Sequence, residues 1–167
     1  MKNLAMDFSV DKENNKIHVK REFAAPVNNV WDAWTKAELL DQWWAPKPYI
    51  AKTRSMDFSE GGTWFYAMIG PQGEEHRCRA DYQTISPQQS FTGLDAFCDE
   101  HWNTNTDFPR TKWDVAFHQD GEYTVVEVVM TYEKLSDLEM IIQMGFKEGF
   151  TMALGNLDEL LAQHDLK

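Results

Sequence analysis

The sequence has no long apolar run and very little cysteine. No segment approaches the ~20 consecutive apolar residues of a membrane-spanning helix, so an integral membrane protein is not expected. Only Cys78 and Cys98 are present, and their spacing fits neither a metal site nor a redox motif. We therefore expect two free thiols in a reducing compartment.

Positive charge is also scarce. Sixteen Lys and Arg residues stand against 27 Asp and Glu residues, which gives a net charge of −11. Such a chain would repel a phosphate backbone and an anionic membrane surface, so neither nucleic acid nor membrane is an expected partner. Residues 1–16 lack the apolar core of a secretory signal, and the expected location is the cytoplasm.

Common catalytic and cofactor motifs are missing from the sequence. There is no Gly-x-Ser-x-Gly elbow, no phosphate-cradling glycine loop and no pair of zinc ligands, so we predict no catalytic residue, metal or cofactor. The densest cluster of polar ligands runs from Asp95 to His101. Alternate residues of a strand point to opposite faces, so Asp95 and Asp99 could share a face whereas Cys98 could not. We interpret this cluster as a solvated strand end.

Aromatic residues are the main positive feature. They make up 13% of the 167 residues and include seven Trp and ten Phe. The chain is 43% hydrophobic and 26% charged, close to the values of ordinary globular domains. Its length suits one core, and no linker or repeat divides it, so we expect a single domain over residues 1–167.

The spacing of apolar residues predicts the order of the elements. Alternation predicts a strand over Lys16–Ala25, and helical spacing over 27–44 predicts two short helices after Pro26. Further strands are predicted between turn signals, at residues 49–59, 63–69, 75–85, 90–100, 111–119 and 122–133. Residues 101–110 are expected to form a surface loop. An apolar stripe beginning near Ser136 predicts one helix of roughly 28 residues.

This order favours an α+β fold. A curved antiparallel sheet of six or seven strands would wrap around the long C-terminal helix, in a helix-grip arrangement. If Ile85 pairs with Ser90 across the turn between them, Cys78 falls opposite Phe97, and Cys98 lies on the other face. A disulfide between the two cysteines is then disfavoured.

Several apolar side chains are predicted to share the concave face of this sheet. By parity, Trp64, Tyr66, Trp113 and Phe117 should be mostly buried beneath the final helix. Ordinary core packing and the lining of a cavity fit this pattern equally well. Gly145 and Gly149 lie on the apolar face of the predicted helix, where they indicate either close packing or space for a ligand.

Local sequences spread over nearly the whole chain resemble one known family. They include Arg21-Glu22-Phe23-Ala24-Ala25-Pro26, Leu39-Leu40-Asp41-Gln42-Trp43-Trp44, Gly61-Gly62-Thr63-Trp64 and Gly145-Phe146-Lys147-Glu148-Gly149-Phe150. Together they are similar to homologues of the activator of heat-shock protein ninety ATPase, within the START-like, birch-allergen-like superfamily. The loop at residues 101–110 departs from the family pattern.

This resemblance implies a cavity between the sheet and the helix that takes a small apolar or amphipathic ligand. The candidate ligand-binding residues are Trp43, Trp64, Tyr66, Met68, Phe97, Trp113, Phe117, Met130, Ile141, Gly145, Gly149 and Met152.

Two other functions stay open at this point. The family name implies a chaperone partner, to which we give less weight because a lone domain lacks the additional chaperone-binding domain of the founding activators. A cavity enzyme of the cyclase or hydrolase type would need an acid or base facing the pocket, but parity directs His118 and Glu127 away from it. Arg77 and Arg79 form a basic strand face. Surface pairing would explain it, or one of them, or Arg54, could anchor a carboxylate at the cavity mouth. A homodimer is also left open.

Overall fold

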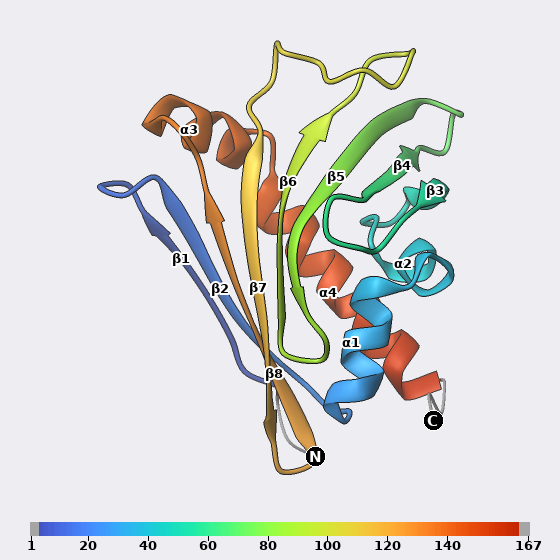
Figure 1. Cartoon of the computed structure of the whole chain (residues 1–167), viewed down its shortest axis with the longest axis vertical. Helices are drawn as coiled ribbons and strands as arrows, with labels where there is room; N and C mark the ends of the chain where they lie inside the picture. The colour runs from blue at the N-terminus through green and yellow to red at the C-terminus, as the bar shows by residue number, and fades with distance from the viewer. Residues whose placement is uncertain (1–3, 164–167) are drawn as a thin grey trace.

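The structure, a computed structural model that describes residues 4–163, is built on one curved antiparallel sheet (Figure 1). Eight strands follow one another in the order β1-β2-β8-β7-β6-β5-β4-β3. Their bounds are β1 Met6–Asp11, β2 Lys16–Phe23, β3 Ile50–Met56, β4 Thr63–Ile69, β5 Glu75–Ser86, β6 Ser90–Phe97, β7 Thr111–Asp120 and β8 Tyr123–Thr131.

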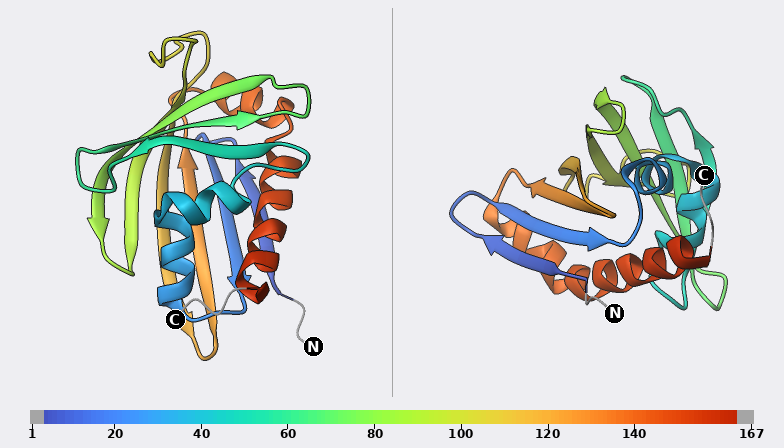
Figure 2. Two further views of the ribbon diagram at one scale, coloured as in Figure 1. Left: turned by 90° about the vertical axis from the view of Figure 1, so that its right-hand side faces the viewer. Right: turned by 90° about the horizontal axis from the view of Figure 1, so that it is seen from below.

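Four helices complete the fold. Two of them, α1 (Val27–Thr35) and α2 (Ala37–Trp43), connect β2 to β3, and the other two, α3 (Leu135–Gln143) and α4 (Phe146–Gln163), follow β8. The views in Figure 2 show α4 running along the concave side of the curved sheet, with α1 and α2 beside it. The predicted helix-grip architecture is therefore confirmed.

Strand alternation directs the large apolar side chains inward, as predicted. Trp64, Tyr66 and Phe117 are at most 5% exposed, and Trp113 is half-buried. Cys78 lies opposite Phe97, as predicted, but the assumed pairing of Ile85 with Ser90 was wrong. Ser90 pairs with Ser86 instead, and a register shift between Tyr82 and Thr84 brings Cys78 opposite Phe97. Both cysteines are free thiols.

The predicted strand count of six or seven was too low, because it omitted β1. This strand pairs with β2 at the edge of the sheet and presents Met6, Phe8 and Val10 in alternation. Val10 is still 38% exposed, and polar residues separate the three apolar ones. An edge strand that buries so little gives a weak sequence signal.

The single long helix predicted after Ser136 was also wrong, because Gly145 divides it into α3 and α4. Gly145 has φ +87°, its N–H donates to the Ile142 carbonyl, and its own carbonyl accepts from the Gly149 N–H. It thus ends one helix and begins the next, in a left-handed conformation that glycine adopts at little cost.

The C-terminal half of α4 is tied to its surroundings by polar contacts. Asn156 donates to the main-chain carbonyls of Trp43 (3.4 Å) and Ala45 (3.0 Å) at the end of α2. Asp158 forms an ion pair with Arg21, a buried residue on the concave face of β2. These contacts hold this half of the helix against both α2 and the sheet.

The loop between β6 and β7, at the top of Figure 1, packs against the convex face of the sheet through Trp102. The Arg54 and Arg77 guanidinium carbons lie 4.9 Å and 5.3 Å from the centroid of the Trp102 ring. Phe65 packs edge-on against the same ring, at 6.0 Å.

The remaining arginines of this face are paired with acid. Arg79 and Arg110 both donate to the carboxylate of Asp81. The basic face predicted for Arg77 and Arg79 is therefore explained by surface pairing and ring stacking, and neither side chain lines a cavity.

Gly145, between α3 and α4, and Gly155, inside α4, should respond to alanine in opposite ways. We expect Gly145→Ala to cost about 1–2 kcal/mol, because alanine is strained at positive φ. Gly155→Ala should stabilise by up to about 1 kcal/mol, because a Cβ added there meets no atom within 4 Å and glycine weakens a helix interior. Urea unfolding measures both, and changes of the same sign would contradict the helix break.

Candidate functional site

A cavity of about 350 Å³ lies between the sheet and the helices that follow β8. Its sheet side comes from β4, β5, β6 and β7, and its helix side from the end of α3 and the N-terminal half of α4. Gly149 and Ala153 on α4 expose backbone and methyl groups to this space in place of large side chains. The cavity persists there because α4 presents too little volume to fill it.

The cavity brings together seven of the twelve predicted ligand-binding residues. These are Tyr66, Met68, Phe97, Trp113, Ile141, Gly145 and Gly149. Trp64 lines a smaller adjoining cavity of about 40 Å³ that shares Trp44, Tyr66, Asp95 and Trp113 with the larger one.

The other four predicted residues lie elsewhere. Trp43, Phe117 and Met130 are packed in the core and line neither cavity. Met152 is 47% exposed, because the break at Gly145 sets the faces of α4 independently of those of α3. The expectation that Met152 faces a ligand was therefore wrong.

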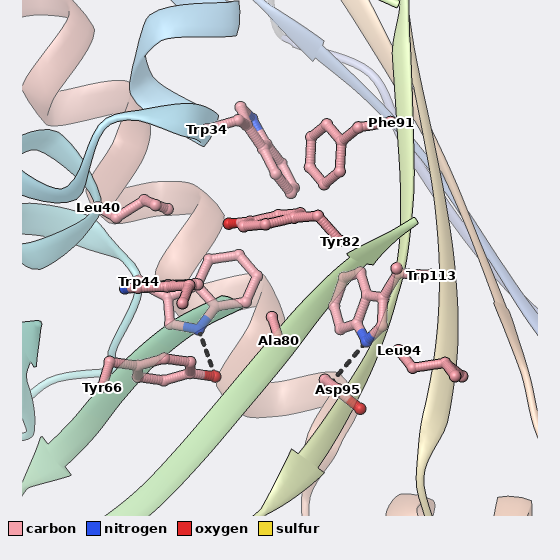
Figure 3. A pocket seen from close by; sticks show the side chains of 12 residues that line it. Trp34, Leu40, Trp44, Tyr66, Ala80, Tyr82, Phe91, Leu94, Asp95 and Trp113 are labelled. Carbon is pink, nitrogen blue, oxygen red and sulfur yellow. Dashed lines mark hydrogen bonds between the residues drawn. The ribbon is translucent and has the colours of Figure 1, made fainter. Parts of the chain in front are cut away.

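Within the Trp pair, Trp43 was expected to bind the ligand, but it is Trp44 that lines the cavities. Trp43 is fully buried and donates its indole N–H to the Ala33 carbonyl at 2.8 Å. Trp44 instead lines both cavities and donates its indole N–H to the Tyr66 hydroxyl at 3.0 Å (Figure 3). Its ring centroid lies 5.8 Å from that of Trp113. Of these two adjacent residues, Trp43 therefore packs in the core and Trp44 lines the cavities.

Asp95 on β6 was predicted to be solvated, but it lines both cavities, and Figure 3 shows it beside Trp113 in the lining of the smaller one. Oδ2 accepts the indole N–H of Trp113 at 2.7 Å, and Oδ1 accepts the main-chain N–H of Thr111 at 3.1 Å. Burial raises the pKa of Asp95 to about 6, against these hydrogen bonds, which favour its ionised form. Phe97, two residues further on, was assigned to the cavity, and the same parity would have placed Asp95 beside it.

Other polar groups surround the Asp95 carboxyl in the lining. They are Tyr66 on β4, Cys78 on β5, Thr111 on β7 and Tyr132 just after β8. Burial raises the pKa of the Cys78 thiol to about 12 and the pKa of the Tyr66 hydroxyl well above its ordinary value. Both groups are neutral at physiological pH, so Asp95 is the one ionised group in this part of the lining.

The mouth of the cavity lies between β5 and the junction of α3 with α4. Two lining residues are exposed there: His76, whose ring centroid lies 5.8 Å from that of Tyr49, and Met144, which is 51% exposed. Of the described residues that line the cavity, only His76 can carry positive charge. An entering molecule would pass these residues before it reached Asp95.

Comparison with known proteins identifies relatives of the same length. The family model described as Activator of Hsp90 ATPase homolog 1-like protein matches residues 24–162. No match was found among curated proteins. Within residues 4–163, no helix combines the length and apolar character needed to cross a membrane.

Solved structures share the fold over almost the whole chain. Protein Ms6760 from Mycobacterium smegmatis is 30% identical, with a TM-score of 0.87 over 95% of this chain and 97% of that one. A protein from Arthrobacter aurescens is 26% identical (TM-score 0.90, 95% and 92% covered), and one from Staphylococcus epidermidis is 30% identical (0.82, 93% and 94%).

The raised pKa of Asp95 predicts an unusual pH dependence of stability. At Asp95 the native protein takes up a proton at about pH 6, whereas the unfolded chain does so near pH 4. The contribution of this group to the free energy of unfolding should therefore fall by about 2 kcal/mol as pH rises from 4 to 7. Asp95→Asn should lose this contribution. Urea unfolding against pH measures the difference between the two proteins.

Asp114→Asn provides the matched control, because Asp114 lies on β7 but does not line either cavity. It should keep the pH slope of the wild type. If Asp95→Asn and the wild type showed parallel stability profiles, the carboxyl group would be solvated after all.

Proposed function

Because the chain belongs to the family of Activator of Hsp90 ATPase homolog 1-like proteins, we propose that it binds a small amphipathic ligand in the cavity over the N-terminal half of α4. The supporting observation is the cavity of about 350 Å³, whose walls are mainly aromatic and aliphatic. Ligand sites typically have such walls, with a few fixed polar groups that orient the bound molecule. We base the proposal on the cavity and not on the chaperone activation that the family description names.

The lining favours binding over catalysis. Nucleophilic chemistry would need an activated thiol or hydroxyl, but burial raises the pKa of Cys78 to about 12 and so keeps its thiol protonated. Tyr66 is held neutral in the same way. Asp95 has a pKa suited to proton transfer, but it stands without an activated nucleophile among the described lining residues.

The walls of the cavity are well placed to report on occupancy. Trp44 and Trp113 lie in the lining, and Phe150 contacts both rings at 6.3 Å and 5.8 Å between centroids. A ligand that displaces water from these rings should change the tryptophan emission. Binding can therefore be followed without a label.

Filling the cavity from α4 should abolish binding. In Gly149→Leu, the new Cβ makes ordinary contact with Pro46 Cγ at 3.6 Å, and the rest of the side chain has the cavity to occupy. We expect stability within about 1 kcal/mol of the wild type, because the glycine penalty is removed. Affinity for N-phenylnaphthylamine, a neutral probe that fluoresces on burial, should fall at least about tenfold.

Gly155→Leu is the control on the same helix. A Cβ at Gly155 meets nothing within 4 Å, and Gly155 lines neither cavity, so this variant should bind the probe as the wild type does. A wild-type protein that fails to bind the probe, or equal binding by Gly149→Leu, would refute the proposed site.

A further inference from the structure

The carboxyl group of Asp95 lacks the compensation given to another carboxylate of the same sheet. Asp81, on the convex side, accepts hydrogen bonds from both Arg79 and Arg110. Asp95, on the concave side, forms no ion pair with any described residue. Its hydrogen-bond partners, Trp113 and Thr111, are neutral, and Arg110 contributes only a Coulombic attraction, the smallest of the five influences on its pKa. A carboxylate buried without a cation is costly, which makes such a site rare in a purely structural role.

The two hydrogen bonds fix the direction of the carboxyl group. Trp113 and Thr111 both belong to β7, and each donates to a different oxygen of Asp95. A carboxylate has about four acceptor positions, so the group keeps capacity for a further donor. Because Asp95 lines both cavities, that remaining capacity is available to a molecule inside them.

No neighbouring element supplies a counter-ion from inside the cavity. The sheet contributes Tyr66, Cys78 and Tyr132, which are neutral. The lining from α4 consists of Phe146, Gly149, Phe150 and Ala153, and the end of α2 contributes Trp44. Arg110 donates to the Asp95 main-chain carbonyl at 3.3 Å, while its NH2 group pairs with Asp81. His76 lies at the mouth.

We propose that the ligand of this cavity is an amphipathic organic amine, whose ammonium group pairs with Asp95 while its apolar part lies against the aromatic walls. This inference rests on the proposed binding function and specifies the charge of the bound ligand. Ammonium donors satisfy the free acceptor positions of the carboxylate, and aromatic rings favour cations over anions. An anionic ligand would instead meet an uncompensated carboxylate.

The charge of the whole protein acts in the same direction. The net charge of −11 attracts cations and repels anions at long range. On the convex face, four arginines are engaged by Asp81 or by aromatic rings and do not reach the cavity. The Asp95 carboxylate and the net charge of the protein therefore both favour a positively charged ligand.

Three ligands with the same chain length separate charge from apolar character: n-octylamine, n-octanol and octanoate. Each is titrated into the full chain near about pH 8, where Asp95 is ionised, and followed by displacement of N-phenylnaphthylamine and by tryptophan emission. We expect n-octylamine to bind at least about tenfold more tightly than n-octanol, and octanoate to bind most weakly. Asp95→Asn should remove the preference for the amine and leave n-octanol affinity within about threefold.

Asp114→Asn makes the same charge change outside the cavity and should keep the amine preference. If n-octylamine and n-octanol bind equally to the wild type, the amine inference is overturned while ligand binding stands. If the probe and all three ligands fail to bind, the proposed function itself is refuted.

A pH series tests the inference without relying on a folded Asp95→Asn variant. Affinity of the wild type for n-octylamine should fall as pH drops below about 6, because Asp95 becomes protonated while the amine stays charged, and affinity for n-octanol should stay level. The decline should persist in His76→Gln, which removes the imidazole from the cavity lining. Constant amine affinity between pH 8 and 5, or loss of the decline in His76→Gln, would overturn the role of Asp95.

Discussion

The attachment of α4 at its C-terminal half is the constraint on which the cavity depends. Asn156 binds two carbonyl groups at the end of α2, and Asp158 pairs with Arg21 on the sheet. A helix held at this end cannot move bodily onto the sheet at the other. The N-terminal half therefore spans a space that the small residues Gly149 and Ala153 leave unfilled, and Gly145 lets the chain change direction before it.

The sheet separates two electrostatic environments. On its convex face, the arginines stack on Trp102 and Phe65 or pair with Asp81, so charge is compensated within the protein. On its concave face, Asp95 is held by neutral donors alone. Adjacent strands thus carry both a satisfied ion-pair network and an uncompensated carboxyl group, and strand parity decides which residue joins which environment.

The parts of the fold that follow from local patterns were predictable from the sequence. Alternation placed Tyr66 and Phe117 inside, because a one-residue slip would have exposed a whole apolar face. The register at the turn between β5 and β6 was wrong by one residue, because the sequence does not reveal the shift between Tyr82 and Thr84 that brings Cys78 opposite Phe97. The break at Gly145 was missed, because an apolar stripe crossing a glycine does not reveal a positive φ. Edge strand β1 was missed because it buries little on either face.

The division of the aromatic residues between core and cavity could not be predicted, because it depends on which space the helices leave open. Trp43 and Trp44 are equivalent in the sequence, yet the end of α2 directs one into the core and the other toward Tyr66. The sequence likewise could not show that Trp64 lines only the smaller cavity or that Met130 lies in the core. Periodicity identifies the buried face but gives no measure of its packing.

Asp95 shows most clearly where stability and binding conflict. Its burial raises its pKa to about 6, so ionisation at neutral pH destabilises the native state. An apolar residue would avoid this cost, and an arginine brought through from the convex face would offset it. The fold does neither, and Trp113 and Thr111 instead hold the carboxyl group toward the cavity. A cation bound in the cavity would stabilise the charge that the protein leaves uncompensated, so the same residue that weakens the empty protein would strengthen its complex.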